Sequence, residues 1–269
     1  MSASTTRLLG RRDCLRALAS LAAPLCVSVP ALAARPRLLR FTFSRRFDDP
    51  RTQWLIAVYR EALASLGVGF EFLDVPAGRA PLAIEAGEAD GELGRTRAYG
   101  DLYPSLVRVP EANNTVEFAV YAAGDSGLVD FPGWSAVRAQ GLTCEHRRGI
   151  QELAALLARE AAPGHVSTVT TIEQGVRRLQ LKRVALYFDV QEAVQDYLAF
   201  GDASPQVRAG PAPSLLRIVE STTGHAYLHR RHEALVPMLS DTLQNMKRQG
   251  IVTRLREDAL QRFLAARTR

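Results

Sequence analysis

Two arginines that follow a short alternating segment are the residues of this chain best suited to binding chemistry. Apolar and polar positions alternate from Ala89 to Leu93, the run ends on Gly94, and Arg95 and Arg97 come directly after it. This pattern predicts a strand that delivers two guanidinium groups into the loop at its carboxyl end, where open α/β sheets bind ligands. Because arginine holds a carboxylate or phosphate through two parallel hydrogen bonds, we expect a pocket for a small anionic or zwitterionic molecule. The alternative is a solvated turn with two surface arginines.

Asp189 is the acidic counterpart of these arginines. It follows the apolar run 184–188, which predicts a strand that ends at the same kind of sheet edge. A carboxylate there would accept hydrogen bonds from a ligand ammonium group and complement Arg95 or Arg97. Aspartate is also strongly favoured as a helix N-cap, and a helix is expected next, so the two roles are compatible.

Two further residues lie in expected loops where a ligand could reach them. Arg148 precedes Gly149 at the start of an expected helix, where backbone N–H groups favour anions. Phe47 lies in a polar turn after the first expected strand and would cover a ligand with its ring. Both are also ordinary residue types for a protein surface.

The sequence does not support a nucleophile or a metal site. His225, His229 and His232 fall within eight residues, and such clusters can bind zinc. However, the alternation around the first two predicts a strand that points them away from the third, and no neighbouring side chain completes a ligand set. Cys144 lies in an expected buried strand and is predicted to be a small core residue. We expect no metal and no cofactor.

Residues 1–33 have the three parts of a secretory signal peptide. Four arginines and one acid precede an uncharged, mostly apolar run at 17–29, and an Ala-x-Ala motif follows at 31–33. The apolar run is too short to span a bilayer. The pair Arg11-Arg12 also resembles a twin-arginine export signal, and export by either route predicts a periplasmic protein.

Cleavage of this leader changes the composition in two ways. The formal charge falls from +6 to about +3, and the remaining basic residues form no stripe with aromatic residues, so we expect no nucleic-acid partner. Cys144 becomes the single cysteine of the mature chain, which excludes an internal disulfide. About 235 residues remain, enough for one sizeable core or two small ones.

The elements that must position these residues alternate between strand and helix. The first part predicts strands at 38–43, 68–75, 89–93 and 116–122 and helices at 54–66 and 80–86. The pattern then restarts, with strands at 142–144, 166–169 and 184–188 and helices at 149–161, 171–181 and 189–198. A loop at 201–213, a strand at 215–219 and helices at 232–249 and 253–266 close the chain. This order predicts two α/β units with mostly parallel sheets.

Three segments together resemble a known family in their order and spacing. They are 82–90 (LAIEAGEAD), 172–184 (IEQGVRRLQLKRV) and the tail 227–255, which includes Met246-Lys247-x-x-Gly250. Through them the chain resembles the family 3 periplasmic solute-binding proteins, the amino-acid receptors of ABC transporters.

The resemblance implies a type II periplasmic-binding-protein fold, in which two α/β lobes close around an interlobe cleft through a hinge. One lobe would comprise 35–120 plus 216–269 and the other 121–215. In the family an arginine after the third strand holds the ligand α-carboxylate, and Arg95 or Arg97 occupies that neighbourhood. An acid of the second lobe holds the α-ammonium, and Asp189 lies within one residue of its register.

We therefore predict a monomeric, non-enzymatic periplasmic protein that captures an amino acid or related carboxylate. An inner-membrane ABC permease or a membrane sensor would recognise its ligand-closed state. One alternative is a dehydratase-like lyase on the same fold, with Glu92 and Asp189 as general acid or base candidates. Another is a module that binds no ligand and only signals to a membrane partner.

Overall fold

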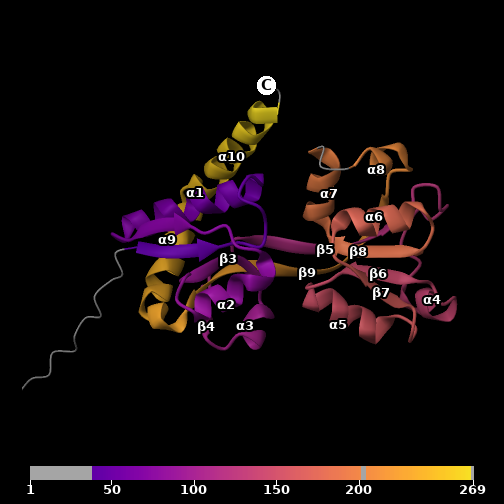
Figure 1. Cartoon of the computed structure of the whole chain (residues 1–269), viewed down its shortest axis with the longest axis horizontal. Helices are drawn as coiled ribbons and strands as arrows, with labels where there is room; N and C mark the ends of the chain where they lie inside the picture. The colour runs from indigo at the N-terminus through magenta and orange to yellow at the C-terminus, as the bar shows by residue number, and fades with distance from the viewer. Residues whose placement is uncertain (1–37, 201–203, 268–269) are drawn as a thin grey trace, which may run out of the picture. The chain divides into compact units, whose positions relative to one another are not determined.

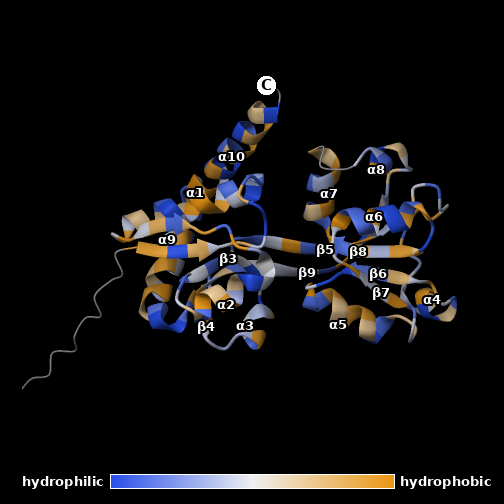
Figure 2. Ribbon diagram, viewed as in Figure 1, coloured by the Kyte–Doolittle hydropathy of each residue, from blue (hydrophilic) through white to orange (hydrophobic). Residues whose placement is uncertain are grey.

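The computed structural model of the protein describes residues 38–200 and 204–267, and the predicted leader at 1–33 lies outside these ranges. In the described part, helices lie on both faces of a central sheet (Figure 1). These helices carry both hydrophobic and hydrophilic residues along their length, as expected for helices with one buried and one solvated face (Figure 2).

The first part of the chain builds a parallel unit, which we call lobe 1. Its elements are β1 (Leu38–Thr42), α1 (Pro50–Ser65), β2 (Gly69–Phe72), η1 (Ala77–Arg79), α2 (Ala80–Glu85), β3 (Gly91–Thr96), α3 (Tyr99–Leu102) and β4 (Leu106–Arg108). β1 lies between β2 and β3 and runs parallel to both. Helix α1 begins after Asp49, whose side chain accepts a hydrogen bond from the backbone N–H of Arg51, and Gly67 follows its end with a φ of 74°.

The middle of the chain builds a second unit, lobe 2, which has three parallel strands and a fourth that is antiparallel to its neighbour. Its elements are β5 (Asn114–Ala122), α4 (Trp134–Ala139), β6 (Cys144–Arg147), α5 (Gln151–Glu160), β7 (Val166–Val169), α6 (Ile172–Gln180), β8 (Leu186–Val190), α7 (Gln191–Ala199) and α8 (Pro205–Ala209). β6 lies between β7 and β8 and is parallel to both. Thr171 is the N-cap of α6, because its hydroxyl accepts a hydrogen bond from the N–H of Gln174.

One long strand joins the two lobes. β9 (Ser214–His229) pairs along most of β5 and then continues to pair with β3 and β4. The whole sheet therefore has the order β2-β1-β3-β9-β5-β8-β6-β7. The chain closes with η2 (Arg230–Leu235), α9 (Val236–Arg248) and α10 (Ile251–Arg267), which belong to lobe 1.

Each lobe buries hydrophobic side chains on both faces of its part of the sheet. In lobe 1, α1, α9 and α10 cover one core, and α2 and α3 cover the other. In lobe 2, α4 and α5 cover one core, and α6, α7 and α8 cover the other. The residue bounds predicted for the two lobes, 35–120 with 216–269 and 121–215, stay a prediction.

Several predicted elements are corrected in their extent. The strand expected to end on Gly94 continues through Thr96, so Arg95 lies inside β3 and only Arg97 follows it. Gly94 is needed for packing rather than for a turn, because a Cβ there would lie 2.5 Å from Cε2 of Phe43. A register shift between Glu92 and Arg95 marks the irregularity that a β-bulge produces.

Other corrections concern lobe 2 and the joining strand. β6 extends to Arg147, three residues beyond the predicted strand, and β8 includes Asp189, which was expected to follow it. The loop expected at 201–213 contains α8, which Ser204 caps. The strand predicted at 215–219 is β9, which extends to His229 through the polar stretch 220–224; that stretch hid its continuation.

Candidate functional site

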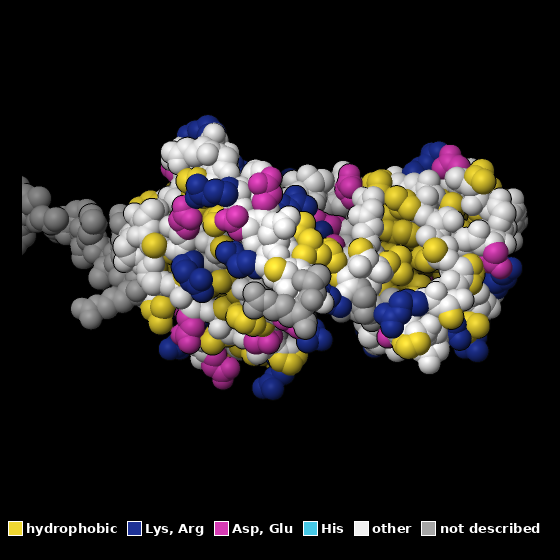
Figure 3. All heavy atoms as spheres, turned by 90° about the horizontal axis from the view of Figure 1, so that it is seen from above, with side chains coloured by type: hydrophobic (Ala, Val, Ile, Leu, Met, Phe, Trp, Pro, Cys, Tyr) yellow, Lys and Arg dark blue, Asp and Glu magenta, His cyan; other side chains and the backbone are white. Residues whose placement is uncertain are grey.

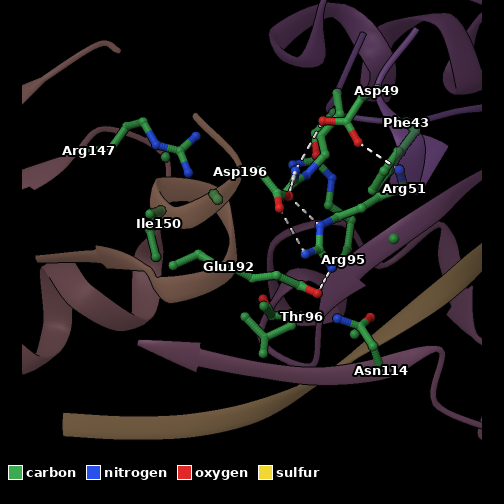
Figure 4. A pocket seen from close by; sticks show the side chains of 18 of the residues that line it. Phe43, Asp49, Arg51, Arg95, Thr96, Asn114, Arg147, Ile150, Glu192 and Asp196 are labelled. Atoms are coloured by element: carbon green, nitrogen blue, oxygen red, sulfur yellow. Dashed lines mark hydrogen bonds and ion pairs between the residues drawn. The ribbon is translucent and has the colours of Figure 1, made fainter. Parts of the chain in front are cut away.

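The described structure contains a cleft of about 800 Å³ that is lined by both lobes. Its walls are formed where parallel strands end: after β1 and at the end of β3 in lobe 1, and after β6 and at the end of β8 in lobe 2. Figure 4 shows side chains from both lobes directed into this space. The cleft thus occupies the edge at which open α/β sheets bind ligands.

Two of the five sequence-predicted site residues line the cleft, Arg95 in lobe 1 and Arg148 in lobe 2. Three others do not line it. Arg97 is exposed after β3, and the Phe47 ring is 51% exposed and packs against Phe72. Asp189 is completely buried behind the cleft wall.

In lobe 1, a buried carboxylate fixes the orientation of Arg95. Its guanidinium donates to Glu92 from Nε at 2.6 Å and forms an ion pair from Nη2 at 2.5 Å. The Tyr99 hydroxyl donates to the other Glu92 oxygen at 2.7 Å, and the arginine lies over the Tyr99 ring. Burial alone would lower the pKa of Arg95, but the Glu92 carboxylate outweighs burial and raises it. Arg95 therefore stays charged along the cleft wall.

Lobe 2 repeats this arrangement with residues that sequence analysis only partly identified. Arg147, at the end of β6, donates from Nε and Nη2 to Asp189 at 2.8–3.2 Å, and the Tyr187 hydroxyl donates to the same carboxylate. Burial lowers the pKa of Arg147, but the hydrogen bonds to Asp189 outweigh it and raise the pKa. Asp189 consequently serves to orient an arginine. The Arg147-Arg148 pair at a strand end was the signal that would have identified Arg147.

Helix α7 of lobe 2 contributes two acids that contact lobe 1. Asp196 accepts from Nε of Arg51 at 2.7 Å and from Arg45 at 3.4 Å. Glu192 pairs with Arg51 and, at 3.2 Å, with Arg256 of α10. We call these five residues the α7 latch; Figure 4 shows its acids in the cleft between the two walls.

Arg148, which follows β6, and Glu152, in the first turn of α5, are two charged residues that lack such partners. In the described part of the chain, neither an ion pair nor a hydrogen bond joins the side chain of Arg148 or of Glu152 to another residue. Both residues line the cleft. One Glu152 oxygen, Oε1, is buried without any hydrogen-bond partner.

The contacts of His225 and Cys144 indicate roles in the structure rather than in binding. His225 is hydrogen-bonded through Nδ1 to the Val109 carbonyl and through Nε2 to Thr223, and burial lowers its pKa. Among the described residues, no group of three His, Cys, Asp or Glu side chains is arranged to hold a metal ion. Cys144 is buried, as predicted, and burial raises the pKa of its thiol to about 11.

The surface carries charges of both signs. On the face shown in Figure 3, Lys and Arg side chains alternate with Asp and Glu side chains, most densely over lobe 1. None of the helices in the described part is both long and apolar enough to cross a membrane.

No family model matches the sequence. An uncharacterized protein of Shewanella oneidensis is 27% identical over 256 residues, which are 95% of this chain and 94% of that protein. This relative carries no functional name, so its similarity over nearly the full length indicates a shared fold without naming a ligand.

Solved structures identify the fold. The lysine complex of a putative ABC-transporter binding component from Wolinella succinogenes has a TM-score of 0.63 and 13% identity, over 82% of this chain and 95% of that one. A histidine kinase sensor domain similar to periplasmic binding proteins has a TM-score of 0.64 and 14% identity, over 84% and 97%. The ancestral amino-acid-binding protein AncCDT-1, a precursor of cyclohexadienyl dehydratase, has a TM-score of 0.61 and 13% identity, over 82% of this chain and 95% of that one.

The chain therefore has the type II periplasmic-binding-protein fold, as the sequence resemblance implied. Most of these similar structures are amino-acid-binding proteins rather than enzymes. The predicted class, a solute-binding protein similar to family 3, agrees with them.

Proposed function

We propose that this protein is a receptor that captures a small carboxylate-bearing solute, such as an amino acid, in the cleft between its lobes. The observation that carries this proposal is the pair of cleft arginines, Arg95 and Arg147, each held in place by a buried carboxylate and a tyrosine. Preorganised guanidinium groups bind a carboxylate without first losing side-chain entropy. Arg148 adds a third guanidinium in the same cleft.

Closure follows from differential affinity. A ligand held by lobe 1 alone stabilises open and closed states equally, whereas a ligand that also contacts Arg147 or Arg148 stabilises the closed state. β5 and β9 are the strands that pass between the lobes, so rotation would be absorbed there. Register shifts in the β5–β9 pairing, at Phe118/Ala119 and Val120/Tyr121, mark the irregular part of this connection.

The partner we propose is a membrane protein that recognises the closed state. An ABC permease is supported by the transporter binding components among the similar structures. A membrane sensor is supported by the histidine kinase sensor domain. In either case the site is periplasmic, in agreement with the predicted leader.

The first test is a thermal-shift screen of the mature protein with the standard amino acids and small organic acids. A ligand that binds the native state stabilises it, by about 2.7 kcal/mol when the free ligand is at a hundred times its Kd. This stabilisation raises the melting temperature. We expect at least one amino acid or carboxylate to raise it, by a shift that grows with the ligand concentration. If no compound of either class has an effect, the protein does not function as a receptor for such solutes.

A lyase is the second candidate, because one similar structure is the precursor of a dehydratase. The acid–base candidates suggested by the sequence, Glu92 and Asp189, are both completely buried, and each is hydrogen-bonded to an arginine and a tyrosine. A general acid or base must reach the substrate proton. This arrangement favours binding over catalysis, and turnover of a ligand found in the screen would reverse that preference.

A further inference from the structure

Asp189, near the end of β8, is already occupied by groups of its own lobe. Arg147 donates to it from Nε at 2.9 Å and from Nη2 at 2.8 Å, the Val190 N–H donates at 2.7 Å, and the Tyr187 hydroxyl also donates to it. The residue is completely buried, so a ligand does not reach it. Sequence analysis assigned the ligand ammonium group to this carboxylate, but in the structure the guanidinium of Arg147 fills that place.

Arg147 presents the positive charge of this pair to the cleft. Its side chain remains 29% exposed and lines the cleft, and Figure 4 shows its guanidinium directed into the space between the lobes. The bonds to Asp189 engage Nε and Nη2, whereas a guanidinium carries five N–H donors on three nitrogens. Donors therefore remain on this arginine for an acceptor of a ligand.

The acids of lobe 2 that line the cleft offer little to a ligand cation. The two latch acids, Glu192 and Asp196, are paired with arginines of lobe 1. Glu152 is half-buried, and its Oε1 is buried. Arg148, next to Arg147, is exposed and also lines the cleft. Lobe 2 therefore offers a ligand chiefly guanidinium donors.

We propose that Arg147 is the group of lobe 2 that binds the ligand, and that this ligand is a dicarboxylate with one carboxylate on Arg95 and the other on Arg147. A guanidinium binds a carboxylate through charge-assisted hydrogen bonds and repels an ammonium group placed at the same point. A dicarboxylate held at both ends contacts both lobes and so stabilises the closed state. This inference rests on the proposed receptor function and adds the chemical class of the ligand.

The first test measures binding by isothermal titration calorimetry at about pH 7.5, where both carboxyl groups of a dicarboxylate are ionised. The series malonate, succinate, glutarate and adipate identifies the best chain length. The best dicarboxylate is then compared with two compounds of matched length in which one carboxylate is replaced by an amide or by an ammonium group; for glutarate these are glutaramate and 5-aminopentanoate. We expect the monoamide to bind at least tenfold more weakly than the dicarboxylate, and the ω-amino acid more weakly still.

Variants then assign the preference to Arg147. In Arg147→Gln the Asp189 carboxylate loses its cation, so we expect dicarboxylate binding to weaken at least tenfold and the ω-amino acid to bind more tightly than it binds the native protein. Because this variant leaves a buried charge unpaired, the double variant Arg147→Gln/Asp189→Asn removes both charges together. In the double variant we expect the advantage of the dicarboxylate over its monoamide to fall at least fivefold.

Arg178→Gln is the matched control for an unpaired acid. Arg178 pairs at 2.6 Å with Glu145, a completely buried acid of the same lobe, and it is not among the described residues that line the cleft. This variant creates the same kind of unpaired buried acid as Arg147→Gln but should leave all three affinities unchanged. Melting temperatures without ligand verify that each variant folds.

The outcomes separate this inference from the proposed function. Equal binding of the dicarboxylate and its monoamide by the native protein, or tighter binding of the ω-amino acid, overturns the dicarboxylate class and leaves the receptor function standing; this comparison needs no variant. A screen in which amino acids bind and dicarboxylates do not has the same consequence. An advantage of the dicarboxylate that survives unchanged in both Arg147 variants overturns the role of Arg147. A screen in which no carboxylate-bearing compound binds overturns the receptor function and, with it, this inference.

Discussion

At the residue scale, both walls of the cleft hold a charged arginine in the same way. In each lobe a strand carries a completely buried acid, Glu92 or Asp189, that binds the guanidinium while a tyrosine donates to the same carboxylate. Removing one member would leave the other charge unpaired in a partly buried site, which is strongly destabilising. Substitutions here therefore affect folding as well as binding.

Asp90, just before β3, gives a residue-scale prediction about pH. Burial raises its pKa, but hydrogen bonds from His232, the Arg40 N–H and Arg231 outweigh it and lower the pKa to about 2. The unfolded value is about 3.9, so the ionised form stabilises the fold above about pH 4 and this contribution is lost as pH falls towards 2. In urea unfolding, we expect Asp90→Asn to be less stable than the native protein at pH 7 and the gap to narrow towards pH 3.

Asp101→Asn, an exposed residue of α3, is the control for this measurement and should match the native protein throughout. A stability gap for Asp90→Asn that is constant between pH 7 and pH 3 would contradict the role given to the Asp90 carboxylate.

Residue types at strand ends were predictable from the sequence, and their pairing was not. Alternation and apolar runs placed Arg95, Arg148 and Asp189 close to the ends of strands, which is where the structure has them. The partner of Asp189 is Arg147, 42 positions away, and the partner of Asp196 is Arg51, 145 positions away. Local patterns carry no information on such long-range contacts.

At the element scale, α7 is the helix of lobe 2 whose side chains pair with lobe 1. The Arg51 and Asp196 side chains are only 15% and 18% exposed, so their pair is screened less than a surface pair. Without ligand, the latch favours closure. We expect Asp196→Asn to increase the radius of gyration of the ligand-free protein in small-angle X-ray scattering and to weaken ligand binding several-fold, since less of the closed state is populated.

Asp130→Asn is the matched control, because Asp130 pairs with Arg217 of the joining strand β9, with both side chains more than half exposed. It should change neither quantity. An unchanged radius of gyration in Asp196→Asn, at low salt where ion pairs are strongest, would show that the latch does not hold the lobes together.

Element types were predicted better than element limits. The parallel strands and the helices between them were identified from period and capping signals such as Thr171. The two ends of β9, at 215–219 and around His225 and His229, were predicted as strand, whereas its polar middle, Glu220–Gly224, was missed because its pairing with β5 rather than its composition defines it. β3 was cut short at Gly94, a glycine that close packing against Phe43 requires.

At the scale of the whole molecule, the fold explains why the site lies between two lobes. Each lobe has its own cores, and a continuous sheet joins them through β5 and β9. Strand ends from both lobes therefore line one cleft. The order of elements predicted this architecture, whereas the charges that determine ligand class emerged only from the assembled structure.

The most direct test of the central claim is a crystal structure of the protein with the tightest-binding compound from the screen. The account predicts electron density in the cleft, with the ligand carboxylate within hydrogen-bond distance of a guanidinium from Arg95, Arg147 or Arg148 and with contacts to both lobes. A ligand bound outside the cleft, or held by one lobe alone, would contradict the account.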